Sequence, residues 1–447
     1  MTKVLVADRK YDCTHMLGQF PTEADYDFLI EEDIDVYMPA DCELATQADC
    51  DRDCSSCETG ADERRIVLKF RKNYFTKEQQ DQAYAGLREA AVESQNRGIA
   101  AGPRQGSLGN RQRVTDYEYE ILDQFLKPAQ NLFGEDPVEV IRKKHKDQKS
   151  SASNRARVWS IERVKKEKFN FDEWVDQMKT LPEDEAKKKA EYVAEKLICA
   201  TTYANSVHSG IAGWFDRYPR IPYGRATSYT RDHFDKFKMS YPFLQQLAQG
   251  FKDLLPWRYN NQMQAASKLD KSYLVPETPF TTITVNKSFR TACHFDAGDL
   301  NSGLSNLLTL SNNGNYTGCY LVAPEYRVAI NIRPGDLLLI NNHEVMHGNT
   351  EIVCHDEIAE RISLVCYFRE KMLELGSRAY EDCRYQFVED RRHNKEHPDQ
   401  RSLWNGVSSG MWESEEWYDY LETKLGIDEL QKYHPNSIKS NSLEGFF

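Results

Sequence analysis

Three residues in the C-terminal half of the sequence have the types and the spacing of a metal site. In TACHFDAGD, His294 and Asp296 are two residues apart, so on an extended strand both side chains lie on the same face. His347 follows about fifty residues later in MHGNT, just beyond the apolar run DLLLINN. Two histidines and one carboxylate form the facial triad that holds iron(II) and leaves coordination positions open. We therefore predict that His294, Asp296 and His347 bind iron(II).

The open positions of such a triad suit oxygenation by dioxygen and a 2-oxo acid. A 2-oxo acid can occupy two positions through its keto and carboxylate oxygens and leave the third for dioxygen. The far carboxylate of 2-oxoglutarate then needs a fixed planar cation, and Arg361, which begins the next β-rich run, can supply a bidentate pair. Ser363, two residues on and on the same face, could donate a hydroxyl hydrogen to that carboxylate.

Other histidines near the second ligand leave an alternative open. An HxD triplet alone recurs by chance, and the signal comes from its combination with a later His and Arg in consecutive short strands. His343 lies four residues before His347, at the end of an expected strand, where it could be packed or support a ligand. His355 is expected in a surface loop. We favour His347 because it lies beyond the strand and is followed by small residues.

The elements that must position these residues change in character along the chain. Helical stretches are expected near 77–96, 116–127, 184–199 and 233–254, after a strand expected in RRIVLKFRKNYF. From residue 280, seven short β-rich runs separated by turn residues predict an antiparallel sandwich or small barrel. Helices before strands imply an α+β fold whose β core is braced by helices on one side. A polar tail with an expected helix near 413–424 follows.

The composition predicts a globular chain, which we expect in a reducing, intracellular compartment. No apolar run approaches the roughly 18 residues that a membrane helix requires, and the first residues lack the apolar stretch of a secretory signal. The 11 cysteines are an odd number, and six are expected to be free thiols. Four others lie close together and could close a tetrahedral zinc site, although their spacing lacks the paired CxxC form. The six are Cys199, Cys293, Cys319, Cys354, Cys366 and Cys383, and the four are Cys42, Cys50, Cys54 and Cys57.

Charge is distributed unevenly around the net value of −12. Residues 1–60 hold 15 Asp and Glu against 4 Lys and Arg, whereas residues 142–168 hold 11 Lys and Arg against 3 Asp and Glu. The basic run could face phosphates or could be a solvated helix and loop. The acidic segment could compete with a nucleic acid for a basic surface, in which case deleting residues 1–60 would tighten nucleic-acid binding.

Taken together, the segments TTITVNKSFRTACHFDAGDL, YTGCYLVAPEYRVAINIRPGDLLLINNHEVMHGNTEI and ERISLVCYF resemble the catalytic core of the TET/JBP family, especially its smaller viral and microbial members. The resemblance covers about 90 residues closely. It implies a double-stranded β-helix (jelly-roll, cupin-like) core at 280–370 within a dioxygenase domain at 65–375. An acidic, cysteine-containing region at 1–64 and a polar extension at 376–447 flank that domain.

The resemblance also implies roles for individual residues. It implies that His294, Asp296 and His347 bind iron(II) and that Arg361 binds 2-oxoglutarate. Asp299 matches a family position near the active site, so we expect it to support the metal site or the substrate. Asn286 and Arg290, which precede the HxD triplet, could bind the cosubstrate or position the base, or could instead form a turn-stabilising pair.

The implied activity is hydroxylation of the 5-methyl group of 5-methylcytosine in DNA, with thymine as the alternative base. Such a base must be flipped out of the duplex to reach an iron inside a barrel. Candidates for stacking on it are Phe295, Tyr316 and Tyr320, each of which could instead be core. Gly-flanked arginines at Arg104, Arg111, Arg113 and Arg225 could grip phosphates. The location would be a DNA-containing compartment, either the cytoplasm or the nucleus.

Two further readings remain open from the sequence. The triad would equally serve an alkylated-base demethylase or a protein hydroxylase, which differ only in the walls of the pocket. A non-catalytic DNA-binding module could retain the same β core. Release of succinate from 2-oxoglutarate in the presence of methylated DNA, unmethylated DNA or protein separates these cases.

Overall fold

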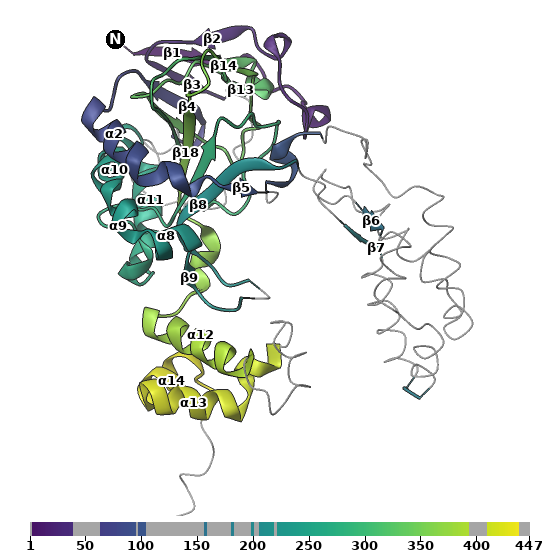
Figure 1. Cartoon of the computed structure of the whole chain (residues 1–447), viewed down its shortest axis with the longest axis vertical. Coiled ribbons are helices and arrows are strands. Elements are labelled where there is room, and N and C mark those ends of the chain that lie inside the picture. Colours follow the sequence, from purple (N-terminus) through teal and green to yellow (C-terminus); the bar gives the residue numbers. More distant parts are fainter. Residues whose placement is uncertain are drawn as a thin grey trace, which may run out of the picture.

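Two facing β-sheets and a layer of helices make up the core of the computed structural model (Figure 1). The structure describes residues 2–38, 63–94, 97–103, 156–158, 180–182, 198–200, 205–218, 221–392 and 409–437. No helix within these ranges is long and apolar enough to cross a membrane.

The larger sheet has ten strands and carries most of the predicted β-rich runs. Its central strands pair antiparallel, with β10 between β18 and β8 and with β11 between β15 and β18. In order across the sheet the strands are β1 (Lys3–Val6), β3 (Ile34–Tyr37), β4 (Ile66–Arg71), β15 (Leu337–Ile340), β11 (Ser305–Ser311), β18 (Arg361–Tyr367), β10 (Thr282–Lys287), β8 (Val207–Phe215) and β5 (Glu93–Ser94), with β9 (Arg225–Ala226) also paired to β8.

A smaller sheet faces it. Its order is β16 (Gly348–Asn349), β13 (Leu321–Ala323), β14 (Val328–Ile330) and β2 (Phe28–Ile30), and a separate pair joins β12 (Tyr316–Gly318) to β17 (Ile352–Cys354). Away from these sheets, β6 (Ala156–Val158) pairs antiparallel with β7 (Ile198–Ala200). The predicted α+β fold with a double-stranded β-helix core is confirmed by the two facing, mainly antiparallel sheets.

The two-residue period of the strands separates the two faces of the larger sheet. On β18, Ile362, Leu364 and Cys366 belong to the main hydrophobic core, whereas Arg361 and Ser363 point to the opposite face. The same alternation holds on β10, where the core residues Ile283 and Val285 flank Thr284, and on β11. One face therefore packs on helices and the other lines an internal cavity.

Helices cover the apolar face, as predicted. On α10 (Tyr241–Leu254), Phe243, Leu244, Leu247 and Phe251 recur at helical spacing and are buried in the main core. A capping box between Thr76 and Gln79 begins α2. The layer comprises α2 (Lys77–Leu87), α8 (Ser228–Asp232), α9 (Phe234–Met239), α10 and α11 (Pro256–Ser267). The expected helix at 233–254 is thus two helices that meet at Ser240, and the one expected at 116–127 lies outside the described residues.

The N-terminal region is part of both sheets. β3 pairs antiparallel with β4, β1 pairs parallel with β3, and β2 pairs parallel with β14. The boundary predicted at residue 64 therefore does not separate two structural units. These strands have three or four residues and several acidic side chains, so the periodicity of the sequence did not indicate them. The four cysteines of the predicted zinc site lie outside the described residues.

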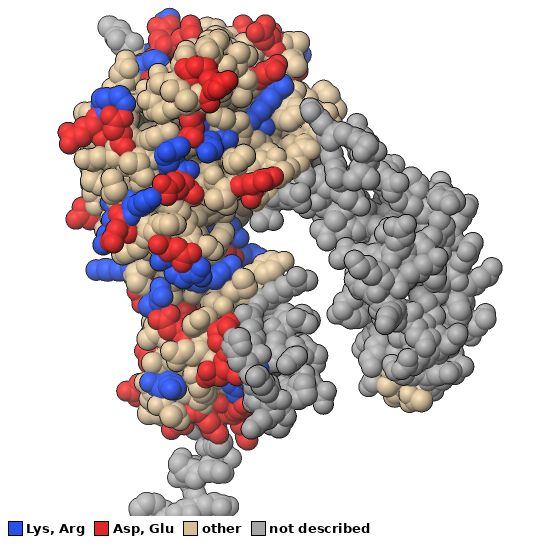
Figure 2. All heavy atoms as spheres, viewed as in Figure 1, with Lys and Arg blue, Asp and Glu red and all other residues tan. Residues whose placement is uncertain are grey.

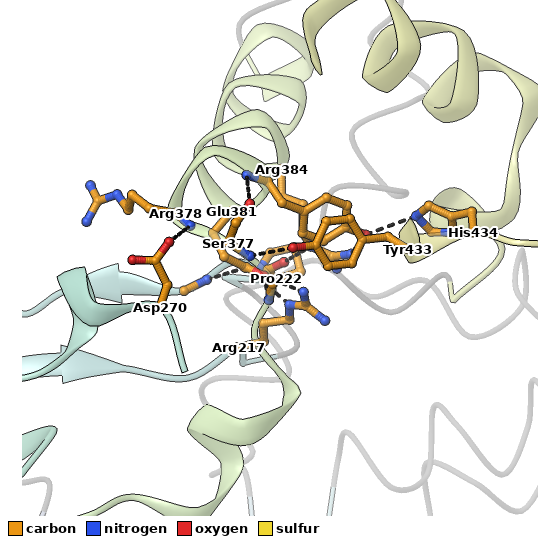
Figure 3. Close-up of polar contacts among 12 residues, drawn as sticks. Arg217, Pro222, Asp270, Ser377, Arg378, Glu381, Arg384, Tyr433 and His434 are labelled. Carbon is orange, nitrogen blue, oxygen red and sulfur yellow. Dashed lines mark hydrogen bonds and ion pairs between the residues drawn. The ribbon is translucent and has the colours of Figure 1, made fainter. Parts of the chain in front are cut away.

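Three helices follow the core: α12 (Arg378–Arg392), α13 (Glu415–Leu425) and α14 (Ile427–Tyr433). They share an aromatic cluster of their own, which includes Tyr380, Phe387 and Trp417, so the predicted polar extension has a hydrophobic centre. Figure 3 shows how α12 joins the core, with Glu381 and Arg217 pointing toward each other. The helix expected near 413–424 corresponds to α13.

Of the six cysteines predicted to be free thiols, five are unpaired. Cys293, Cys319, Cys366 and Cys383 are buried, and Cys354 is exposed. The side chain of Cys199 lies outside the described residues.

Candidate active site

His294 and His347 lie side by side because their backbones pair antiparallel. The His294 amide donates to the His347 carbonyl at 2.9 Å, and the His347 amide donates to the His294 carbonyl at 3.0 Å. Gly348 permits this approach, since a Cβ at that position would lie 2.9 Å from the Cys293 amide nitrogen. The two segments, distant in sequence, are thereby joined at the residues predicted to bind metal.

Asp296 completes a group of three metal-binding side chains. One potential ligand atom from each of His294, Asp296 and His347 lies within 4.8 Å of the others. Asp296 Oδ1 is 3.3 Å from His294 Nε2, and Asp296 Oδ2 is 3.9 Å from His347 Nε2. Asn342 Nδ2 also donates to Asp296 Oδ2 at 3.0 Å, which orients the carboxylate.

Backbone carbonyls prepare both imidazoles for a metal. His294 Nδ1 lies 2.8 Å from the Ala292 oxygen, and His347 Nδ1 lies 3.0 Å from the Val345 oxygen. A proton on each Nδ1 satisfies these carbonyls and leaves the Nε2 lone pair free to coordinate. The donor set of two Nε2 atoms and one carboxylate therefore fits iron(II).

Electrostatics give His347 and Asp296 the protonation states that metal ligands need. Burial acts to lower the pKa of His294, but the hydrogen bond with Asp296 and its charge prevail and raise it. Burial, reinforced by the charge of His294, lowers the pKa of His347 to about 4. For Asp296, burial acts to raise the pKa, but the hydrogen bond with His294 and the nearby histidine charges prevail and lower it to about 2. At neutral pH, His347 is neutral and Asp296 is ionised.

The alternative histidines do not join this group. His343 Nδ1 lies 3.3 Å from the backbone oxygen of Asp296, and the His343 side chain is not part of the group of three metal-binding side chains. His355 is exposed. The structure thus places His347, as favoured from the sequence, with His294 and Asp296.

A cavity of about 620 Å³ opens beside the three side chains, between the two sheets. Its walls include Arg361, Ser363 and Asn286 from the polar face of the larger sheet. Asn286 on β10 pairs with Ser363 on β18, which in turn pairs with Thr309 on β11, so the strand register aligns these polar side chains in one row. A polar small molecule can therefore bind next to the metal-binding group.

Arg361 lies next to this row, two residues before Ser363 on the same face of β18, and only 2% of its surface is exposed. One Nη donates to Thr309 Oγ1 at 3.3 Å, and Nε has no hydrogen-bond partner. No carboxylate among the described residues forms an ion pair with it. A buried guanidinium with an unused donor is suited to an anionic ligand, because an unpaired buried charge is otherwise costly.

Comparison with known proteins identifies this architecture. Residues 212–370 match the Tet_JBP family model, described as the oxygenase domain of the 2OGFeDO superfamily. The chain contains a TET/JBP oxygenase domain. The predicted enzyme class, a 2-oxoglutarate-dependent dioxygenase, is thereby confirmed for the domain, and the superfamily implies iron(II), 2-oxoglutarate and dioxygen.

Relatives of the TET/JBP domain occur in kinetoplastids. The bifunctional helicase and thymine dioxygenase JBP2 of Leishmania infantum is 35% identical over 167 residues, which are 37% of this chain and 15% of that protein. The thymine dioxygenase JBP1 of Trypanosoma brucei brucei is 35% identical over 174 residues, which are 38% of this chain and 20% of that protein. The match therefore spans a fifth or less of the length of these curated relatives.

Among solved structures, NgTET1 in complex with 5mC DNA aligns with 88% of this chain and 91% of its own, at a TM-score of 0.39 and 12% identity.

One predicted cosubstrate residue does not line the cavity of the TET/JBP domain. Arg290 donates from Nε to the Asn349 oxygen at 3.2 Å and from an Nη to the Pro21 oxygen at 2.9 Å, and its guanidinium lies over the Phe20 ring. The prediction that Arg290 binds the cosubstrate or base is therefore corrected. Its backbone partners direct the side chain toward the N-terminal segment, in agreement with the alternative structural role.

Asp299 does line the cavity, near Asp296. It accepts a hydrogen bond from the Ser305 hydroxyl. Burial, followed by the charge of Asp296, raises the pKa of Asp299 to about 7. A carboxyl group in this position could hold or release a proton near neutral pH, which is consistent with the expected supporting role.

The cavity residues that sequence reasoning missed include Arg97, Tyr367 and Arg369. Arg97 donates to the Ser209 hydroxyl and, at 3.0 Å, to the Gly210 oxygen, while Arg369 is paired with Asp216. Arg97 is far from the triad in sequence and no motif marks it. Tyr367 could have been found from the two-residue period of β18, since it lies on the same strand face as Arg361 and Ser363.

The predicted base-stacking residues behave differently. Phe295 lines the cavity and is 37% exposed, so it remains accessible to a ligand. Tyr316 is buried with the Arg333 guanidinium over its ring, and neither it nor Tyr320 lines the cavity. Those two tyrosines therefore follow the alternative reading, with Tyr316 in the core.

The predicted phosphate contacts are only partly described. Arg225 donates to the Asp216 oxygen at 3.0 Å and lies over the Phe215 ring, so its guanidinium is engaged within the domain. Acidic and basic side chains are interspersed over the described part of the face in Figure 2. Arg104, Arg111 and Arg113 lie outside the described residues, as does all but 156–158 of the basic run 142–168.

Proposed function

We propose that the chain hydroxylates the 5-methyl group of a pyrimidine base in DNA. The observation that carries the proposal is one cavity lined by His294, Asp296 and His347 together with the buried, unpaired Arg361, inside a domain of the TET/JBP family. In this reaction dioxygen and 2-oxoglutarate are consumed, the methyl group becomes a hydroxymethyl group, and succinate and carbon dioxide are released.

The residues of the cavity have distinct tasks in this proposal. His294, Asp296 and His347 would hold iron(II), which when bound supplies the redox chemistry with dioxygen that hydroxylation of a C–H bond needs. Arg361 would bind the far carboxylate of 2-oxoglutarate through two N–H donors, with Ser363 adding a hydroxyl donor. Asn286, in the same row, would fix the orientation of the cosubstrate.

The substrate base would have to leave the duplex to react. The cavity lies between two sheets, whereas the 5-methyl group of a paired base lies in the major groove. Flipping costs a few kcal/mol, which contacts in the pocket must offset. Phe295 is placed to stack on the flipped base because it borders the cavity and is partly exposed.

Thymine and 5-methylcytosine both carry the required methyl group. The sequence resemblance led us to predict 5-methylcytosine first. Relatives at 32–37% identity are named thymine dioxygenases, and these names support thymine as the other candidate substrate. Either base places the chain in a compartment that contains DNA.

Mass spectrometry of nucleosides tests the proposal and distinguishes the bases. The chain is incubated with iron(II), ascorbate, 2-oxoglutarate and a duplex that carries either 5-methylcytosine or only unmodified bases. A 5-hydroxymethylcytosine product from the first duplex supports cytosine specificity, and 5-hydroxymethyluracil from either duplex supports thymine. A His347→Ala variant provides the matched inactive control. Absence of both products, with succinate released in response to protein or to alkylated bases, would contradict the proposal.

A further inference from the structure

Glu325 lies directly behind the loop that carries the second predicted iron ligand. It belongs to the short turn Pro324–Tyr326 and is only 6% exposed. Its Oε2 accepts a hydrogen bond from the Met346 amide at 2.7 Å, and Oε1 is 3.4 Å from Lys10 Nζ. The Glu325 backbone oxygen accepts from the Tyr11 amide at 2.9 Å. One buried glutamate thus contacts both the metal loop and the N-terminal segment.

The Met346 amide hydrogen belongs to the peptide group between Val345 and Met346. The next amide, that of His347, is committed to His294, and the His347 ring is oriented by the Val345 oxygen. The Glu325 carboxylate therefore fixes the plane of the peptide group whose carbonyl oxygen, that of Val345, orients the His347 ring. Because Met346 is buried, its amide has no water to replace this acceptor.

A segment that we call the N-terminal strap, residues 10–21, makes the equivalent contacts at the first ligand. The Gly18 amide donates to the Cys293 oxygen, and the Cys293 amide donates to the Gln19 oxygen, both at 2.8 Å. Cys293 precedes His294 just as Met346 precedes His347. The side chains of both residues pack in one cluster with Cys13 and Met16 of the strap. Leu17 of the strap also lines the cavity.

We propose that Glu325 is a positioning residue for the metal site, and that with the N-terminal strap it holds the two histidine-bearing segments in register. This inference rests on the proposed iron site. Glu325 acts as a hydrogen-bond acceptor for the Met346 amide, and its negative charge is secondary because Lys10 is partly exposed to solvent. Neither Glu325 nor the strap contacts the ligand atoms of the triad.

Metal affinity of three variants tests the inference. Cobalt(II), which is stable in air, serves as the probe in equilibrium titrations of the full chain. Glu325→Ala removes the acceptor and is expected to weaken cobalt(II) binding by roughly 10–100-fold, the usual effect of losing a residue that orients a metal ligand. Glu325→Gln keeps a carbonyl acceptor and is expected to stay within about threefold of wild type. Asp27→Asn is the matched control. Asp27 pairs with Arg327, two residues after Glu325, and so links the N-terminal region to the same segment without contacting the metal loop.

Hydrogen exchange of the metal-free proteins gives a second readout. The Met346 amide is expected to exchange faster in Glu325→Ala than in wild type or Glu325→Gln. A folded Glu325→Ala variant with wild-type cobalt(II) affinity and wild-type exchange at Met346 would overturn the inference, as would a Glu325→Gln variant as impaired as Glu325→Ala. If the wild-type chain itself binds no cobalt(II), the proposed iron site fails, and the exchange rates at Met346 still decide the role of Glu325.

Discussion

The Arg361 guanidinium is a buried charge on the wall of the candidate active site. It is almost fully buried on the polar face of β18, yet its partner among the described side chains is the Thr309 hydroxyl and its Nε is unused. Burying a charge without a counter-charge is unfavourable in a folded protein. A bound carboxylate would remove that penalty, which supports the proposed role of Arg361 in binding 2-oxoglutarate.

Replacing Arg361 is expected to weaken the binding of 2-oxoglutarate selectively. Arg361→Lys cannot form a planar bidentate pair, and hydrogen bonds to charged groups contribute about 1.5–3 kcal/mol, so the apparent KM for 2-oxoglutarate should rise roughly 10–100-fold. The measurement is succinate formation as a function of 2-oxoglutarate concentration. Arg333→Ala, at an arginine that packs on Tyr316 away from the cavity, should leave this dependence unchanged. An unaltered KM in Arg361→Lys would argue against the assignment.

Asp299 should make the metal-free protein less stable as the pH rises. Its pKa is about 7 in the folded chain, against an ordinary value of 3.8. Between these values the folded state binds a proton that the unfolded state has lost, so stability falls from about pH 4 to about pH 7 and then levels off. Asp299→Asn cannot ionise, and it should raise the melting temperature by a few degrees at pH 8 and by less at pH 5.

Thermal unfolding in the presence of a chelator measures this difference. The comparison is between wild type and Asp299→Asn at both pH values, with each change in melting temperature taken relative to wild type. Asparagine retains an acceptor for the Ser305 hydroxyl, so the packing contact is conserved. An equal shift at pH 5 and pH 8 would show that ionisation of Asp299 does not affect stability.

At the scale of elements, α12 is fastened to the β8–β9 connection by one carboxylate. Glu381 is fully buried and accepts hydrogen bonds from Arg217, from the Gly224 amide at 2.7 Å and from the Gly376 amide at 2.9 Å (Figure 3). Asp216, next to Arg217 in the chain, pairs with Arg369 of the cavity wall. The C-terminal helices are thus connected to the candidate active site through consecutive residues.

Removing the Glu381 carboxylate should therefore loosen this junction. Glu381→Ala leaves a partly buried Arg217 and two amides without their acceptor, and breaking a buried ion pair costs about 3–5 kcal/mol. Urea denaturation, followed by the fluorescence of tryptophans such as Trp412 and Trp417, reports the loss. Asp382→Asn is the matched control, because Asp382 pairs with Arg378 on the surface, where such a pair contributes about 0–1 kcal/mol. Equal stabilities of the two variants would contradict a junction held by Glu381.

At the scale of the whole molecule, the N-terminal residues complete the structure around the site. β3 extends the larger sheet beyond β4, and β2 extends the smaller sheet beyond β14. Ile30, Ile34 and Val36 are buried in a core shared with both sheets. The predicted competition between the acidic segment and DNA therefore has to be tested without removing these strands.

A chain that lacks residues 2–62 should be strongly destabilised. Deletion exposes the apolar face between the sheets and leaves two unpaired strand edges, which favours aggregation. Soluble yield and thermal unfolding report this effect. Amide substitutions at the exposed Asp8 and Glu23 neutralise charge while retaining the strands, so tighter DNA binding by that variant would support competition. A truncated chain as stable as the full chain would contradict the structural role.

The residue set of the candidate active site could be predicted from the sequence. His294 and Asp296 lie two residues apart, as do Arg361 and Ser363, and the shared face of each pair is a local property of an extended strand. The structure brings both pairs together with His347. The alternation within β10, β11 and β18 likewise indicated which residues would be buried. Both signals depend on neighbours in the chain, which a periodic pattern records.

The other residues around this set could be identified only from the folded structure. Arg97 reaches the cavity through contacts with β8, and Arg290 is turned away from it by carbonyls of Pro21 and Asn349. The N-terminal strands join the sheets, and Glu325 meets the metal loop, through pairings between distant segments. Such contacts depend on how the elements pack in three dimensions, and the spacing of residues along one chain carries no record of them.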